Sequence, residues 1–437
     1  MSLLIRRIIF YGVLIIFIIA APIIIIYTAG YRYNFKQKKF LKTGAIIITT
    51  NPSEAAIWLN NRLRQEQTPA RLLNLTPGDY ALRLTQTDYH SWEKIIKVES
   101  EQATFIDKVT LFKKTEPKLM DAGAIIDVMQ TSQNGDAIYL KQEGGFSEIW
   151  RLDQLGPHLI WRDALTGTIQ LRDWSNKSQT LLLTAGKEWF ILSDQPTIQL
   201  QSLKTLTGKP WDKIVLTNFS DIAFGISNEN LYSLNFKNGN TDFLEPAIRD
   251  VVANDENIVI LQEQKNNLKL KIIKNNQTRE IIDLPIGNYQ LRSSAMPWLA
   301  VYNQKADKLL LINQNDHQIK EFDGKDVVWL LPNNDQFIAY TDSEIWHSKL
   351  AQSQQELLGR LSQKVDQLFA HPSGNAFIFI TDNLVKAAEM DTRGQQNVYT
   401  LATFDKIYQT RMDSAGKTLL VTGIKEKTAG LWRLELR

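Results

Sequence analysis

From about residue 130 to its C-terminal end, the chain of 437 residues repeats one short unit. Each unit has a polar turn, an apolar strand-like segment, a short turn and a second strand with an aromatic residue or leucine. The centres of the apolar segments lie 36 to 44 residues apart, at Ile138, Leu182, Ala223, Val259, Leu299, Ile338, Phe377 and Leu419. A period near 40 with about four strands per unit is typical of the blades of a β-propeller.

The eight units predict a β-propeller over residues 114–437. After Leu434 only three residues remain, so the eighth unit has no room for an outermost strand. We expect residues 116–121 to supply that strand, which closes the ring and removes an open sheet edge. Seven blades with one irregular hairpin are the alternative. The fold class is therefore all-β, apart from one N-terminal helix described below.

The turns of these units resemble those of WD-repeat and TolB-like propellers, in which a turn with proline and glycine precedes the second strand. Residues 371–375, His-Pro-Ser-Gly-Asn, form such a turn, and residues 413–417, Asp-Ser-Ala-Gly-Lys, form a similar one without proline. The units lack the Gly-His and Trp-Asp pairs of true WD repeats, so the resemblance implies the fold and no particular function.

Tryptophan recurs at one position of the repeat, on the third strand of a unit, as Trp150, Trp346 and Trp432. This regularity favours packing between blades over a sugar-binding platform. Six other tryptophans are less regular, and one or two of them are candidates to face the central funnel: Trp161, Trp174, Trp189, Trp211, Trp298 and Trp329.

Residues 8–27 form an uncharged run dominated by isoleucine, with Pro22 inside it. As a helix, 20 residues span about 30 Å, the thickness of the hydrocarbon core of a bilayer. We interpret residues 8–27 as a single transmembrane anchor and residues 1–7 as a cytoplasmic N-terminus. A cleaved secretory signal is the alternative, but this run is longer than a signal core and its candidate cleavage site is weak.

Residues 28–43 form a basic juxtamembrane linker, in which the cations are Arg32, Lys36, Lys38, Lys39 and Lys42. Counted naively, these charges would keep the C-terminal side in the cytosol. Long downstream domains often cross regardless of nearby charge. We expect a single-pass protein of the cytoplasmic membrane with extracytoplasmic C-terminal domains, and a cytosol-facing orientation remains the alternative.

Residues 44–113 alternate between β-branched segments and turn residues, which predicts five to seven short strands in a small sandwich. The stretch 51–56 reads Asn-Pro-Ser-Glu-Ala-Ala, and Thr68-Pro69 and the run 77–80 of Pro-Gly-Asp-Tyr follow it. This pattern resembles a PEGA domain, with alanine where that family often has glycine. The resemblance implies a surface-associated, extracytoplasmic β module of bacteria and archaea, without catalytic residues. We expect Trp58, Tyr80 and Trp92 to fill its core.

The composition excludes several kinds of chemistry. The formal net charge is only +3, which argues against a nucleic-acid partner. With no cysteine, thiolate metal sites and cysteine nucleophiles are excluded. The five histidines lie far apart, at His90, His158, His317, His347 and His371. Phosphate-loop and nucleophile-elbow motifs are absent from the sequence. We therefore predict no catalytic residue, no metal and no cofactor, with His371 in a hydrogen-bonded turn and most blade carboxylates as turn caps.

These observations favour a non-catalytic, membrane-anchored surface protein whose PEGA-like domain and propeller bind an envelope polymer or a partner protein. An extracytoplasmic propeller enzyme that acts on glycans, as a hydrolase or lyase, is the first alternative. A cytosol-facing, membrane-tethered scaffold is the second, and it rests on the basic linker alone.

Overall fold

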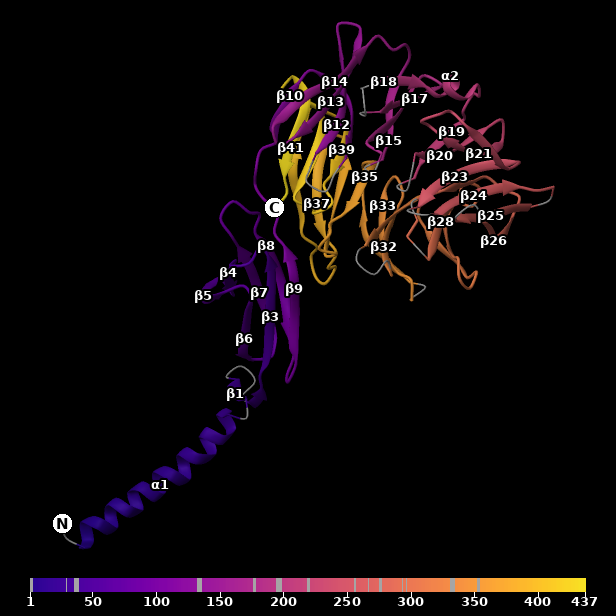
Figure 1. Ribbon diagram of the computed structural model, residues 1–437. Coiled ribbons are helices and arrows are strands. Elements are labelled where there is room, and N and C mark those ends of the chain that lie inside the picture. Colours follow the sequence, from indigo (N-terminus) through magenta and orange to yellow (C-terminus); the bar gives the residue numbers. More distant parts are fainter. Residues whose placement is uncertain are drawn as a thin grey trace. The chain divides into compact units, whose positions relative to one another are not determined.

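The computed structural model describes residues 3–28, 30–34, 39–131, 136–175, 178–193, 199–217, 221–254, 257–265, 267–274, 277–292, 294–295, 297–330, 335–351 and 354–437 (Figure 1). The chain forms two compact units. The first comprises Met1–Lys114 with Asp391–Asn397, and the second comprises Thr115–Met390 with Val398–Arg437.

A helix, α1 (Leu3–Thr28), contains the uncharged run, with Pro22 inside it. Across the part of the chain that the structure describes, no helix has both the length and the hydropathy of a membrane span. The anchor at residues 8–27 therefore stays a prediction. In the linker, strands β1 (Tyr31–Asn34) and β2 (Lys39–Lys42) pair antiparallel, which the basic composition did not predict. Lys36 and Lys38 lie outside the described residues.

The rest of the first unit contains the predicted small sandwich. Its strands are β3 (Gly44–Asn51), β4 (Ala56–Leu59), β5 (Arg62–Gln67), β6 (Ala70–Leu75), β7 (Gly78–Thr85), β8 (Trp92–Val98) and β9 (Ala103–Thr110). One sheet has the order β6-β3-β9 and the other β5-β4-β7-β8. Asn60 and Asn61, both with positive φ, make the tight turn between β4 and β5.

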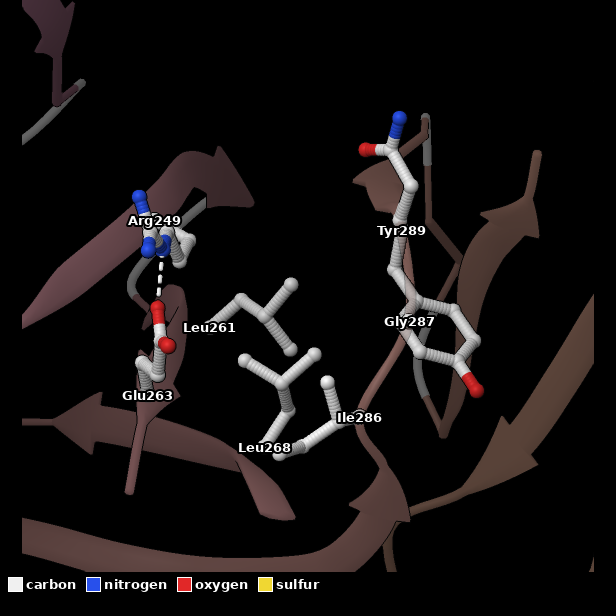
Figure 2. Close-up of a pocket in the computed structure, with 8 residues that line it drawn as sticks. Arg249, Leu261, Glu263, Leu268, Ile286, Gly287 and Tyr289 are labelled. Atoms are coloured by element: carbon white, nitrogen blue, oxygen red, sulfur yellow. Dashed lines mark hydrogen bonds and ion pairs between the residues drawn. The ribbon is translucent and has the colours of Figure 1, made fainter. Parts of the chain in front are cut away.

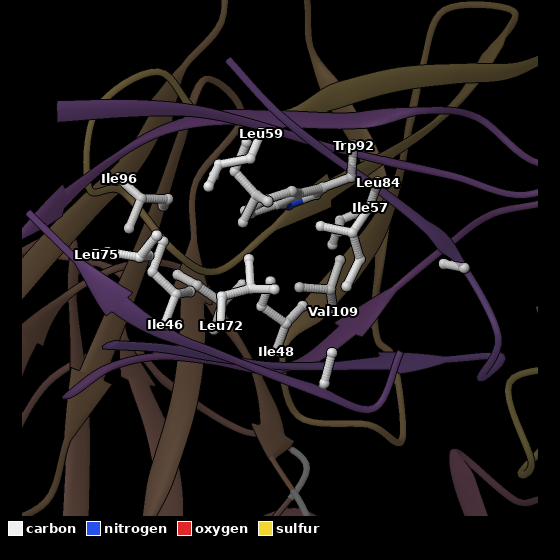
Figure 3. Packing of buried hydrophobic residues seen from close by; sticks show 14 of the residues in the cluster. Ile46, Ile48, Ile57, Leu59, Leu72, Leu75, Leu84, Trp92, Ile96 and Val109 are labelled. Carbon is white, nitrogen blue, oxygen red and sulfur yellow. The ribbon is translucent and has the colours of Figure 1, made fainter. Parts of the chain in front are cut away.

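Alternation along the strands decides which side chains enter the core (Figure 3). On β4, Ile57 and Leu59 point inward and are buried. Trp58 lies between them and therefore points to the other face, where Arg83 covers its ring at 4.6 Å. The expectation that Trp58 fills the core is wrong for this reason. Trp92 is 2% exposed and lies in the core as predicted, and Tyr80 packs against it while partly exposed.

The second unit contains eight four-stranded antiparallel sheets within the described residues. Seven are continuous in sequence: β11 (Ala124–Gln130), β12 (Ala137–Glu143), β13 (Phe146–Asp153), β14 (Gly156–Asp163); β15 (Ile169–Ser175), β16 (Thr180–Ala185), β17 (Glu188–Ser193), β18 (Gln199–Ser202); β19 (Lys213–Leu216), β20 (Ile222–Ser227), β21 (Asn230–Asn235), β22 (Thr241–Glu245); β23 (Ile248–Asn254), β24 (Asn257–Glu263), β25 (Asn267–Lys274), β26 (Gln277–Pro285); β27 (Tyr289–Leu291), β28 (Trp298–Asn303), β29 (Lys308–Asn313), β30 (Ile319–Asp323); β31 (Asp326–Leu330), β32 (Gln336–Tyr340), β33 (Glu344–Lys349), β34 (Gln355–Arg360); and β35 (Val365–Ala370), β36 (Ala376–Thr381), β37 (Leu384–Glu389), β38 (Val398–Thr403). A short helix, α2 (Leu203–Thr207), follows β18.

The eighth sheet joins both ends of the unit, because β10 (Lys118–Ala122) pairs with β41 (Thr428–Glu435), beside β40 (Thr418–Lys425) and β39 (Lys406–Met412) (Figure 1). Lys118 lies opposite Arg433 in this pairing. The prediction that residues 116–121 supply the missing outermost strand is confirmed. The eight predicted repeat centres each lie on the second strand of one sheet, and each is at most 2% exposed.

Consecutive sheets pack face to face through apolar clusters. One cluster joins β11–β14 to β15–β18, and others continue this packing along the chain. The last sheet packs on the first, since Leu420 and Leu431 share a cluster with Val128 and Tyr139. Trp150 packs against that cluster, which confirms its predicted role between sheets.

Candidate functional site

Each sheet has one end strand that contacts the corresponding end strand of a neighbouring sheet at several points around the unit. This end strand is the first in sequence in seven sheets and is β39 in the eighth. Strand β11, for example, contacts both β15 and β39. Several of these strands share a local pattern in which an apolar residue is followed two positions later by Asp or Gln. The pairs are Ile125 and Asp127, Leu171 and Asp173, Ile248 and Asp250, and Val365 and Gln367. The pairing register shifts inside each pair. A bulge at this point re-aims the polar side chain.

These polar side chains connect one sheet to the next. The backbone N–H of Leu171 donates to Asp127 Oδ2 at 2.9 Å, and that of Leu291 donates to Asp250 Oδ2 at 2.9 Å. Gln367 Oε1 accepts the backbone N–H of Thr410 at 3.1 Å. The other oxygen of Asp127 accepts the N–H of Val128 at 2.9 Å. Both oxygens of this carboxylate are thus held by backbone donors.

A pocket of about 350 Å³ opens beside Asp127, and we call it the inner-strand pocket. It is lined by Ile126, Asp127, Thr168, Ile169, Gln170, Leu171, Arg172, Gln409 and Arg411. These residues come from β11, from β15 with the residue before it, and from β39. The pocket therefore lies where the last sheet meets the first and second sheets.

Burial dominates the electrostatics of the inner-strand pocket. It raises the pKa of Asp127, while the two backbone donors and the cations Arg411 and Arg172 oppose that rise. Burial also lowers the pKa of Arg411, and attraction to Asp127 opposes that change. The pocket thus combines two guanidinium groups with one carboxylate in a partly desolvated setting, which is an arrangement suited to holding an anionic or hydroxyl-rich ligand.

A second pocket of about 350 Å³, the side pocket, lies between the β23–β26 sheet and β27 (Figure 2). Leu261 and Leu268 form a buried apolar floor, and Ile286 is 61% exposed beside them. Arg249 pairs with Glu263 on one side, and Tyr289 lies on the other. The side pocket therefore offers an apolar surface to a ligand, and the opposite charges of Arg249 and Glu263 at its rim neutralise each other.

Among the histidines, His371 takes the predicted turn role. Its Nδ1 accepts the backbone N–H of Ser373 at 3.2 Å, so its proton lies on Nε2, which donates to the carbonyl of Gly416 at 3.1 Å. Burial lowers the pKa of His371 to about 4. The bond to Gly416 also joins two sheets, which the sequence did not predict. Neither described pocket is lined by histidine or tryptophan.

The tryptophans considered for the funnel pack between sheets instead. Trp161 and Trp174 lie against one such cluster, Trp189 and Trp211 belong to the next, and Trp298 and Trp329 to a third.

Blade carboxylates take two roles, and several of them cap turns as predicted, including Asp153 and Asp316. Asp413 also caps a turn, since it accepts the backbone N–H groups of Lys417 and Thr418. Asp127 and Asp250 instead bridge neighbouring sheets. The spacing of Asp127, Asp173 and Asp250 near multiples of the repeat, each two residues after an apolar residue, was the signal that could have identified them.

Comparison with known proteins agrees with both units. Residues 43–113 match the PEGA domain family. A search of curated proteins returned no match. Among solved structures, the Dos1 propeller is 10% identical, with a TM-score of 0.51, and the alignment covers 74% of this chain and 94% of that one. A eukaryotic initiation factor is 11% identical, with a TM-score of 0.49 and coverage of 74% and 91%. AztD from Citrobacter koseri is 12% identical, with a TM-score of 0.45 and coverage of 69% and 98%.

At these identities the likeness to solved structures establishes the fold alone. The family match covers the small sandwich, whose seven strands and buried core are described above. Residues 43–113 are therefore a PEGA domain, and the ring of sheets that follows it has the fold of a β-propeller.

Proposed function

We propose that this protein is a non-catalytic binding protein of the cytoplasmic membrane. In this proposal residues 8–27 are a single-pass anchor, residues 1–7 are cytoplasmic, and residues 44–437 are extracytoplasmic. The eight sheets act as eight blades, and the propeller and the PEGA domain bind an envelope polymer or a partner protein. The observation that carries the proposal is the inner-strand pocket, in which cations are available to a ligand and the carboxylate is not.

The state of Asp127 favours binding over catalysis. A general acid or nucleophile needs a carboxylate oxygen that reaches the reacting atoms. One oxygen of Asp127 accepts the backbone N–H of Val128 on its own strand, and the other accepts the backbone N–H of Leu171 on β15. Glycoside hydrolysis uses two carboxyl groups about 5–9.5 Å apart. Within the described lining of each pocket there is one carboxylate, and Glu263 in the side pocket is paired with Arg249.

The surface of α1 supports the anchor. The large apolar side chains described along it, from Ile9 to Tyr27, are between 41% and 67% exposed. A bilayer removes such a surface from water at a gain of about 25 cal/mol per Å². At the C-terminal end, the guanidinium of Arg32 lies 3.5 Å from the ring centre of Tyr27, and Tyr33 packs edge-on against Phe40. Aromatic and basic residues gather in this way at a membrane interface.

Two assays test the proposal. A reporter that is active only in the cytosol, fused after Arg437, should stay silent in cells. Strong activity would replace this orientation with the cytosol-facing scaffold. When full-length protein in detergent is mixed with envelope fractions, it should bind a component of those fractions. It should not release soluble fragments from that component. Fragment release that is abolished by a pocket substitution would establish the glycan enzyme instead.

A further inference from the structure

Arg411 is the more buried of the two cations that line the inner-strand pocket. Its side chain is partly buried on β39. One nitrogen, Nη1, donates to the backbone carbonyl of Thr410 at 2.9 Å and to Gln409 Oε1 at 3.3 Å, and both acceptors are neutral. Within the described chain, no carboxylate forms an ion pair with it at 4.0 Å or less. A partly buried cation that has no ion-pair partner in direct contact is costly, and a bound anion would offset that cost.

Arg172 adds a second guanidinium at the mouth of the pocket. It is exposed, its Nε donates to Thr184 Oγ1 at 3.0 Å, and its guanidinium carbon lies 5.7 Å from the ring centre of Trp189. These contacts hold the stem of Arg172, and within the described residues its terminal nitrogens have no hydrogen-bond or ion-pair partner. Arg172 and Arg411 therefore face one ligand space from two different sheets.

The remaining groups set the charge and polarity of the ligand. Asp127 attracts both arginines but is held by backbone donors, so the pocket carries a net charge of about +1 from two cations and one anion. That balance matches a monoanion better than a dianion. Gln170 and Thr168 are exposed in the same lining, and their amide and hydroxyl groups suit a ligand rich in hydroxyl groups. A volume near 350 Å³ lies at the small end of ligand pockets.

We propose that the inner-strand pocket binds a uronic acid residue of an acidic polysaccharide. The sugar carboxylate pairs with Arg411 and Arg172, and the sugar hydroxyls contact Gln170 and Thr168. This assignment rests on the binding function proposed above, and it names the class of polymer.

The test is calorimetric titration of the full-length protein in detergent with a hexuronic acid tetramer, a neutral hexose tetramer and inorganic phosphate. We expect the acidic tetramer to bind and the neutral one to bind at least tenfold more weakly. Arg411→Gln should weaken binding of the acidic tetramer at least tenfold. Arg249→Gln, in the side pocket, is the matched control and should leave the affinity unchanged. Because Arg411 forms no ion pair with any described residue, Arg411→Gln should melt at the wild-type temperature or above it.

Equal binding of both tetramers, or equal effects of Arg411→Gln and Arg249→Gln, would overturn the proposal. Phosphate bound as tightly as the acidic tetramer would reassign the pocket to simple anions. A large drop in melting temperature for Arg411→Gln would give Arg411 a structural role instead. If the acidic tetramer does not bind while the protein still binds a component of envelope fractions, the proposed ligand class is wrong and the proposed binding function stands. If both fail, the binding function falls as well.

Discussion

The stability of the propeller should depend on pH through His371. Burial favours its neutral form, and its pKa is about 4 in the folded protein, against about 6.5 in an unfolded chain. The unfolded state therefore binds a proton below about pH 6.5 that the folded state binds only near pH 4. Linkage then requires the free energy of unfolding to fall as the pH drops through this window. The difference of about 2.5 pKa units corresponds to about 3 kcal/mol in total, and about 2 kcal/mol of it is lost between pH 7 and pH 5.

The assay is guanidinium unfolding of the full-length protein at pH 7, 6 and 5, followed by tryptophan fluorescence. His371→Gln removes the titrating group, so its free energy of unfolding should fall by about 2 kcal/mol less than that of the wild type over this range. His317→Gln replaces an exposed histidine and serves as the control. The raised pKa values of Asp127 and Asp173 act in the opposite direction, but equally in all three proteins. Identical pH dependence in wild type and His371→Gln would refute the reasoning.

Three substitutions and one deletion test the packing. Gly416 has φ of +65°, and a Cβ there would lie 2.5 Å from Pro372 Cδ, so Gly416→Ala should cost on the order of 2 kcal/mol of stability. Gly394→Ala has a similar φ of +70° but open space, and it should cost about half as much in the same unfolding assay; equal costs would exclude the steric cause. Asp127→Ala leaves two backbone N–H groups without their acceptor and should cost about 1–3 kcal/mol by guanidinium unfolding, and a cost near zero would show that the bridge to Leu171 adds nothing. Deletion of residues 416–437 should expose two strand edges and cause aggregation on size-exclusion chromatography, whereas a monomer with a sharp melting transition would contradict closure through β10.

The repeat centres and the ring closure were predictable, because both can be read from patterns of residues that are neighbours in the sequence. An apolar run such as the one around Ile338 identifies a buried second strand, and the three residues left after Leu434 identify a missing strand. The inner-strand pocket was not predictable in this way. Asp127 and Arg411 come together only when the last sheet packs on the first. A sequence shows these residue types without showing that Arg411 has no ion pair in the part of the chain that the structure describes. The prediction that Trp58 fills the core was wrong for a different reason. Its side chain points to the face opposite to those of Ile57 and Leu59, and the size of a side chain alone does not decide which face it occupies.

The pairing of β10 with β41 also has a consequence for synthesis. Lys118 meets Arg433 in this pair, and a ribosome adds about 5–20 residues per second, so β10 waits roughly 15–60 s for its partner to be made. During that interval the nascent ring has an unpaired strand at its beginning and an incomplete sheet at its end. Any chaperone or translocation factor that binds this chain therefore meets a nearly complete ring of sheets with two unpaired strand edges. Synthesis of β41, more than any earlier point in translation, marks the moment when the ring can close and both strand edges become paired.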